Sequence, residues 1–220
     1  MPRLVVINPN RSSWMTRRVG DALALSVDIK QVRVTATDGP EVIDNVATFG
    51  HAAMTVRSEA RRCLTQHGLA DAIVVACFGD PGFEALRADP GMPPVFGLAH
   101  SAMTQAVESQ QRFAVLTCGP AWKPLLTQRA HAFGMSEGLV DVWALPVNGA
   151  VFAHDPALWW PALLQNAQTA ADEGATSLIL GGAVFAGLSV PPAPAGTHWI
   201  DAVQACANDV NKVLGRASPV

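Results

Sequence analysis

The segment Ala72–Gly82, which reads AIVVACFGDPG, indicates the fold of this chain. Its first five residues are all apolar, as is typical of a strand that a parallel sheet buries on both faces. The strand ends in a turn rich in glycine and proline, where a helix is expected to follow. The segment therefore predicts one strand–turn–helix step of an α/β protein.

Similar steps recur along the whole chain. The other predicted strands are 4–7, 113–116, 139–145 and 177–180. Apolar residues spaced by four and three from Val42 to Cys63 predict one long amphipathic helix. Further helices are predicted at about 120–133 and about 157–172. Alternating strands and helices predict a parallel sheet with right-handed crossovers.

The two halves of the chain resemble each other. Arg3–Asn10 aligns with Arg112–Gly119 at an offset of 109, and the strand ending at Cys77 aligns with the strand ending near Gly182 at an offset of 105. Nearly equal offsets favour two similar α/β lobes that face each other, with a boundary near residue 100. The alternative is chance similarity between any two buried strands.

Composition excludes several classes of function. Of the residues, 50% are hydrophobic and 15% are charged, which is too apolar for a disordered chain. The net charge is −3 without any basic run, and this argues against nucleic-acid binding. The uncharged stretch 175–197 is broken by glycines and prolines, so it predicts a buried strand and a loop rather than a membrane span. Without a signal-peptide pattern at the N-terminus, we expect a cytoplasmic protein.

Neither a metal nor a cofactor is expected. The four cysteines, at positions 63, 77, 118 and 206, show no CxxC spacing, and the six histidines are scattered. The signatures of serine hydrolases, dinucleotide-binding proteins and P-loop proteins are absent from the sequence.

Ligands of parallel α/β sheets bind beyond the carboxyl ends of the strands. The predicted strand ends with suitable side chains and glycines are Asn8–Asn10, Ala76–Gly82, Thr117–Pro120 and Gly181–Ala183. Small residues there allow backbone N–H groups to approach an anion or a carbonyl oxygen. The sequence therefore predicts a site for a small molecule with a carbonyl or carboxylate group.

Cys77 is the first candidate for chemistry, because it lies between a buried strand and a predicted helix N-terminus that would lower its pKa. The alternative is that it only fills space in the core. Cys118 occupies the corresponding region of the second half, and its two interpretations are evenly balanced. Cys63 and Cys206 fall on apolar helical stripes and are expected to be packing residues. His100 is a candidate acid or base, although a lone histidine is more often a cap or a surface group.

Several segments together resemble the hydantoin racemase family of the aspartate/glutamate racemase superfamily. The resemblance covers nearly the whole chain in order, and the Ala76–Gly82 segment is its most specific part. The other segments are Ile7–Asn10 with Ser12 or Ser13, Met15-Thr16, Gly39-Pro40, Pro94–Ala99, Phe113–Thr117, Leu180-Gly181 and Ile200-Asp201.

The resemblance implies a fold and a reaction. The fold is two facing lobes, each a parallel four-stranded sheet flanked by helices; the first would comprise residues 1–99 and about 200–220, the second 100–199. The reaction is that of an isomerase without cofactors: two cysteines flank an acidic carbon next to a carbonyl, and one removes the proton that the other returns. The first cysteine matches Cys77.

The second cysteine of the family is replaced here, because the expected Leu-Gly-Cys-Ala reads Leu180–Ala183 with Gly182 at its third position. Glycine supplies neither acid nor base, so full two-sided racemisation is in doubt. Arylmalonate decarboxylases of the same superfamily resemble this state in mirror image, with one cysteine in the second lobe. A single-cysteine decarboxylase, a binding protein without catalysis and an engineered replacement therefore remain as alternatives.

The family pattern also suggests roles for other residues. Asn8, Ser13 and Thr117 would form hydrogen bonds with the ligand, and Phe78 would lie beside it. Backbone amides at Gly79–Asp80 and Gly182–Ala183 would hold the developing oxyanion. His100 stands where the family has an acidic residue, and Cys118 is the preferred candidate for a replacement proton donor. The partners expected are a small-molecule substrate and further copies of the chain.

Overall fold

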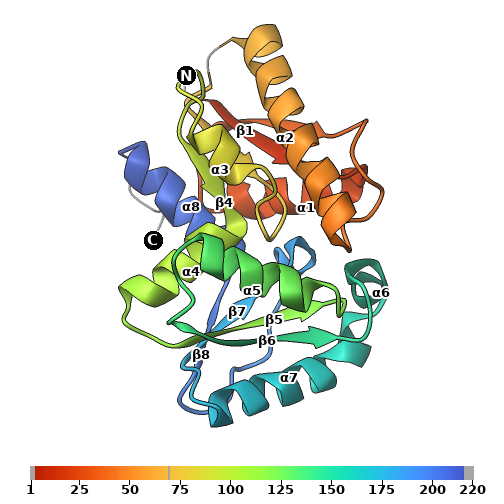
Figure 1. Cartoon of the computed structure of the whole chain (residues 1–220), viewed down its shortest axis with the longest axis vertical. Coiled ribbons are helices and arrows are strands. Elements are labelled where there is room, and N and C mark those ends of the chain that lie inside the picture. Colours follow the sequence, from red (N-terminus) through yellow and green to blue (C-terminus); the bar gives the residue numbers. More distant parts are fainter. Residues whose placement is uncertain (1–2, 69, 216–220) are drawn as a thin grey trace.

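Two four-stranded sheets form the framework of the protein, whose computed structural model describes residues 3–68 and 70–215 (Figure 1). The first sheet has the order β2-β1-β3-β4 and the second β6-β5-β7-β8. The strands are β1 (Arg3–Asn8), β2 (Lys30–Thr35), β3 (Ala72–Val75), β4 (Val95–Gly97), β5 (Phe113–Cys118), β6 (Leu139–Leu145), β7 (Ser177–Leu180) and β8 (His198–Ile200). All pairings are parallel, and this confirms the predicted fold class.

Helices flank both sheets and join them. They are α1 (Ser13–Ala24), α2 (Val46–His67), α3 (Phe83–Arg87), α4 (Leu98–Glu108), α5 (Trp122–Ala132), α6 (Gly149–His154), α7 (Pro156–Asp172) and α8 (Ala202–Val213), with a 3₁₀ turn η1 (Ala183–Phe185). The chain passes from the first sheet to the second through α4, and α8 packs back against α4 and α1 (Figure 1). Residues 1–2 and 216–220, which the sequence assigns to the first lobe, lie outside the described residues.

The register of the strands repeats between the lobes. Leu4 of β1 lies opposite Ala72 of β3, and Phe113 of β5 lies opposite Ser177 of β7. These pairs reproduce the offsets of 109 and 105 found in the sequence. Cys77 and Gly182 therefore occupy equivalent positions, each two residues beyond the end of its strand.

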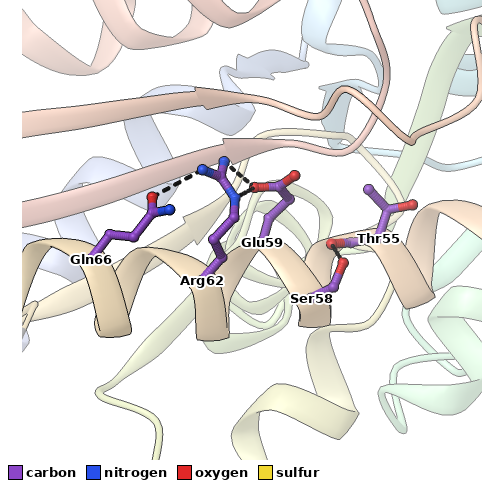
Figure 2. Close-up of polar contacts among 5 residues, drawn as sticks. All are labelled: Thr55, Ser58, Glu59, Arg62 and Gln66. Carbon is purple, nitrogen blue, oxygen red and sulfur yellow. Dashed lines mark hydrogen bonds and ion pairs between the residues drawn. The ribbon is translucent and has the colours of Figure 1, made fainter.

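Helix α2 begins four residues later than the apolar spacing predicts. A capping box fixes its start: the Asn45 side chain accepts the Thr48 N–H at 2.9 Å, and the Thr48 hydroxyl accepts the Asn45 N–H at 3.1 Å. Val42 therefore lies in the preceding loop. Figure 2 shows a polar row on α2, where Arg62 donates to the buried Glu59 carboxylate at 2.8 Å and to Gln66 at 3.0 Å.

One apolar cluster extends through both lobes. It includes Val6 and Val74 of the first sheet and Phe113 and Ile179 of the second, all fully buried. The two sheets are thus packed into one core, which fixes the position of one set of strand ends relative to the other. Among residues 3–68 and 70–215, none of the helices has the length and apolar character that a membrane crossing requires.

Candidate active site

A cavity of about 860 Å³ lies where the carboxyl ends of strands from both sheets meet. The carboxyl end of β5 and the segments that come after β1, β2, β3, β5, β6 and β7 form its wall. The wall includes Asn10–Ser12, Glu41–Asp44, Ala76–Phe78, Thr117–Trp122, Asn148–Ala150 and Gly181–Val184. This is the place where the topology of parallel α/β sheets predicts a ligand.

Two cysteine side chains border this cavity, one from each lobe. Cys77 follows β3 and Cys118 ends β5; they are 7% and 5% exposed. Cys77 belongs to a small apolar cluster with Ile43 and Ala52. Next to Cys118, the Thr117 hydroxyl donates to the Gly181 carbonyl oxygen and so joins the ends of β5 and β7.

The expected lowering of the Cys77 pKa is wrong. The next helix along the chain, α3, begins only at Phe83 and is five residues long, so Cys77 does not lie at its N-terminus. Burial instead raises the pKa of Cys77 far above its usual range, and the nearby Asp80 charge adds to this effect. Burial also raises the pKa of Cys118 to about 12. Both side chains are therefore neutral thiols at pH 7.

The backbone conformation at position 182 does not require a glycine. The φ of 179° and ψ of 135° of Gly182 are extended, a conformation that any residue adopts. A Cβ added there would lie 3.3 Å from the Phe185 ring and 3.4 Å from Val184. A Cβ at this position thus needs the Phe185 ring to move by a few tenths of an ångström.

The profile of the family described as Asp/Glu/Hydantoin racemase matches residues 4–210. The chain belongs to this family. A hydantoin racemase of Rhizobium meliloti is 30% identical over 215 residues, which cover 96% of this chain and 88% of that protein.

Solved structures agree with this assignment. An allantoin racemase from Klebsiella pneumoniae superposes with a TM-score of 0.82 and 26% identity, covering 100% of this chain and 91% of that one. A variant of arylmalonate decarboxylase has a TM-score of 0.66 at 15% identity, covering 100% and 96% of the two chains, and shows the fold alone.

The structure brings some of the predicted site residues together in the cavity wall. The predicted residues in the cavity wall are Cys77, Phe78, Thr117, Cys118, Gly182 and Ala183. Asn8 is absent from the wall because it is fully buried, and its amide donates to Asn10, to the Ser12 carbonyl and to Thr16. Ser13 is exposed at the start of α1, whereas its neighbour Ser12 caps this helix and lines the cavity. Asn8 therefore shapes the loop and does not border the cavity, and the ligand contact predicted for it stays a prediction.

Three further candidates lie behind the wall. The Gly79 backbone has a φ of 107°, and a Cβ there would come within 2.9 Å of Trp122. Asp80 is fully buried, and its carboxylate accepts backbone N–H groups. The His100 ring packs between Phe83 and Phe133, with centroids 4.8 and 5.1 Å away, and burial lowers its pKa. None of the three borders the described cavity.

Fewer of the predicted N–H donors to the oxyanion are available than expected. The Asp80 N–H donates to the Cys77 carbonyl at 3.0 Å, and the Gly182 N–H donates to the Leu180 carbonyl at 3.1 Å. Both groups are already used within the chain. Of the predicted amides, Ala183 is the remaining one whose residue borders the cavity.

Sequence reasoning missed the apolar part of the wall. Trp14, Ile43 and Trp122 border the cavity together with Met15, Val42 and Val184. Residues 41–44 come after β2, which the sequence did not reveal as a strand, so no functional loop was expected there. Within residues 3–68 and 70–215, no group of three or more His, Cys, Asp or Glu side chains is placed to hold a metal ion.

Proposed function

We propose that this chain is a cofactor-independent isomerase of the racemase type, in which Cys77 moves a proton at an acidic carbon next to a carbonyl. The observation that carries the proposal is the Cys77 thiol in the cavity wall, inside the segment that resembles the hydantoin racemase family. The hydantoin and allantoin racemases among its relatives support it.

The charges around the cavity favour a neutral ring as substrate. Among the described residues of the wall, Arg11 is the one Lys or Arg, and it is accompanied by Glu41 and Asp44. Substrates with carboxylates, such as free amino acids, need opposing cations or several N–H donors. A hydantoin-like ring, which carries carbonyl and N–H groups but no carboxylate, suits this wall better.

The reaction uses the small fraction of Cys77 that is present as the thiolate, after its thiol proton has passed to solvent. The thiolate takes the proton from the acidic carbon, and the electron pair of the broken C–H bond moves onto the adjacent carbonyl oxygen. The Ala183 N–H is our candidate donor to this oxygen. The Cys118 thiol then gives its proton to the opposite face of the carbon and becomes the thiolate, so the number of protons is conserved.

Gly182 keeps a second function open. Without a thiol at that position, Cys77 alone can protonate one face of a carbanion, which is the arrangement expected for decarboxylation of a malonate. A protein that binds the ring without turning it over is the remaining alternative.

The test monitors the α-proton of 5-benzylhydantoin in heavy water, together with the optical rotation of the solution. We expect the wild type to exchange the proton for deuterium and Cys77→Ala to lose this exchange. Cys63→Ala is the matched control, since Cys63 is buried on α2 away from the cavity. Release of carbon dioxide from an arylmalonate without hydantoin exchange would favour the decarboxylase, and saturable binding without either reaction would favour the binding protein.

Two further predictions concern the cellular location and the oligomeric state of the protein. We propose a cytoplasmic location and assembly of several copies of the chain. Light scattering coupled to size-exclusion chromatography measures the latter; a mass close to the 23.1 kDa of one chain would contradict it.

A further inference from the structure

Asp80 is a buried carboxylate that the proposed reaction does not use. It lies three residues after Cys77, is fully buried, and does not border the cavity. Its oxygens accept the N–H groups of Ala99 at 3.1 Å and His100 at 2.7 Å, in the first turn of α4. The residue at the N-cap position of α4 is Gly97, which has no side chain to do this. Asp80 therefore caps a helix from a distant segment.

The close approach of Asp80 to α4 requires glycine at position 97. A Cβ on Gly97 would come within 2.3 Å of the Asp80 carboxyl group. Asp80 also has a φ of 54°, in the left-handed region that residues with a side chain rarely adopt. Such a backbone persists only where its surroundings hold it. The two hydrogen bonds to α4 supply that restraint.

The backbone of Asp80 is also hydrogen-bonded to that of Cys77. The Asp80 N–H donates to the Cys77 carbonyl oxygen at 3.0 Å and closes the turn that carries the cysteine. One residue thus connects the backbone of Cys77 to the N-terminus of α4. This turn sets the position of the thiol. Because proton transfer requires contact of roughly 3 Å, a small shift of the turn would impair it.

We infer that Asp80 is a positioning residue, whose carboxylate fixes the Cys77 turn to α4 and so aims the thiol into the cavity. The inference rests on the proposed role of Cys77, but its structural part does not depend on catalysis. It also replaces the predicted role of Asp80 as a ligand contact.

The surroundings of Asp80 make its charge sensitive to pH. Burial raises its pKa to about 7, against the lowering effects of the His100 and Ala99 N–H groups and of Arg129 on α5. The other titratable groups near it are Glu84 on α3, Cys206 on α8 and Cys77 itself. Below pH 7 the carboxyl group becomes protonated and loses acceptor strength, so the wild type is expected to lose turnover on the acid side through this group.

The experiment compares Asp80→Asn with Asp201→Asn. Asp201 is the matched control, because its carboxylate also accepts two N–H groups, those of Val203 and Gln204, at the start of α8. For Asp80→Asn we expect kcat on 5-benzylhydantoin to fall about ten- to hundredfold, with KM within about twofold, as for a misplaced reacting group. The additional fall of the wild-type profile near pH 7 should also be lost, while the rise with pH that comes from the Cys77 thiolate should remain. Asp201→Asn should keep the wild-type kcat.

A second measurement separates this inference from the proposed function. The rate at which iodoacetamide labels Cys77 reports the placement of the thiol without any turnover. We expect Asp80→Asn to change this rate severalfold in folded protein, and Asp201→Asn to leave it unchanged. Unchanged labelling and kcat in a folded Asp80→Asn variant would overturn the inference. If labelling changes while Cys77→Ala retains activity, the proposed function fails and the positioning role stands.

Discussion

The two lobes share a sheet topology but carry different residues beyond equivalent strands. Cys77 and Gly182 both stand two residues beyond a central strand, yet one carries a thiol and the other has no side chain. Asn8 and Thr117 are related in the same way: the Asn8 amide holds its own loop, whereas the Thr117 hydroxyl reaches across to Gly181. Duplication of a fold therefore does not duplicate its chemistry.

The surroundings of the two positions also differ. Cys77 is enclosed by Ile43 and Ala52, which the loop after β2 and helix α2 supply. Gly182 borders Phe185 and Val184 of its own 3₁₀ turn. The first lobe thus buries a thiol, while the second lobe has no side chain at the equivalent position. Substitutions in either lobe can test this asymmetry.

The largest effect is expected from removing the first-lobe thiol. Cys77→Ala should lower proton exchange by about 10²- to 10⁴-fold, the usual contribution of a general acid or base. Exchange is measured by NMR in heavy water, with thermal unfolding to show that the fold is retained. Wild-type exchange in the folded variant would remove Cys77 from the mechanism.

Restoring symmetry should raise racemisation. Gly182→Cys adds a thiol from the second lobe to the cavity wall that Cys77 borders, at a position whose backbone is extended, so the loss of optical rotation of a 5-substituted hydantoin should become at least several times faster. Gly182→Ser is the matched control, because it has a similar size without an acidic thiol. Equal rates in the two variants would mean that the cavity has diverged beyond the missing group.

Cys118 and His100 are the two predicted substitutes for the second thiol, and they can be distinguished. Cys118→Ala should keep deuterium exchange but lose optical inversion, because Cys118 borders the cavity. His100→Ala should keep both, since its ring packs between two phenylalanines behind the wall. If both variants match the wild type in both measurements, the protein works from one face, and the decarboxylase or binding alternative gains support.

The smallest effect concerns the order in which iodoacetamide labels the four cysteines. Cys77 should react ahead of Cys63 and Cys206, because it borders the cavity and they do not, and ligand should slow it. Because burial raises its pKa, the thiolate fraction should grow about tenfold per pH unit from pH 7 to 9, and the labelling rate with it. Peptide mapping by mass spectrometry measures the order. Earlier labelling of Cys63 would contradict the assignment.

The strongest apolar runs of the sequence were enough to predict the central strands. β1, β3, β5 and β7 are buried on both faces and read as continuous apolar segments. The edge strand β2 mixes charged and apolar residues, and β8 is three residues long, so neither produces a clear pattern. The sequence therefore predicts the fold class but misses most of the edge strands of the two sheets.

The candidate site could be predicted only in part, for a related reason. Motif spacing locates Cys77, Thr117 and Gly182 because they come after recognisable strands. It does not show whether a side chain borders the cavity. Asp80 and Asn8 are buried and do not border it. Nor does it predict the pKa of Cys77, since that depends on Ile43 and Ala52 from distant segments.

The core that runs through both sheets has a consequence for how the molecule unfolds. Because Val74 of one lobe and Phe113 of the other belong to the same packed cluster, neither half retains a complete interior when the other opens. The lobes should therefore melt together as one cooperative unit. Slow fluctuations that separate them would expose part of this shared interior, so the cavity between the lobes is held in shape by the stability of the whole chain.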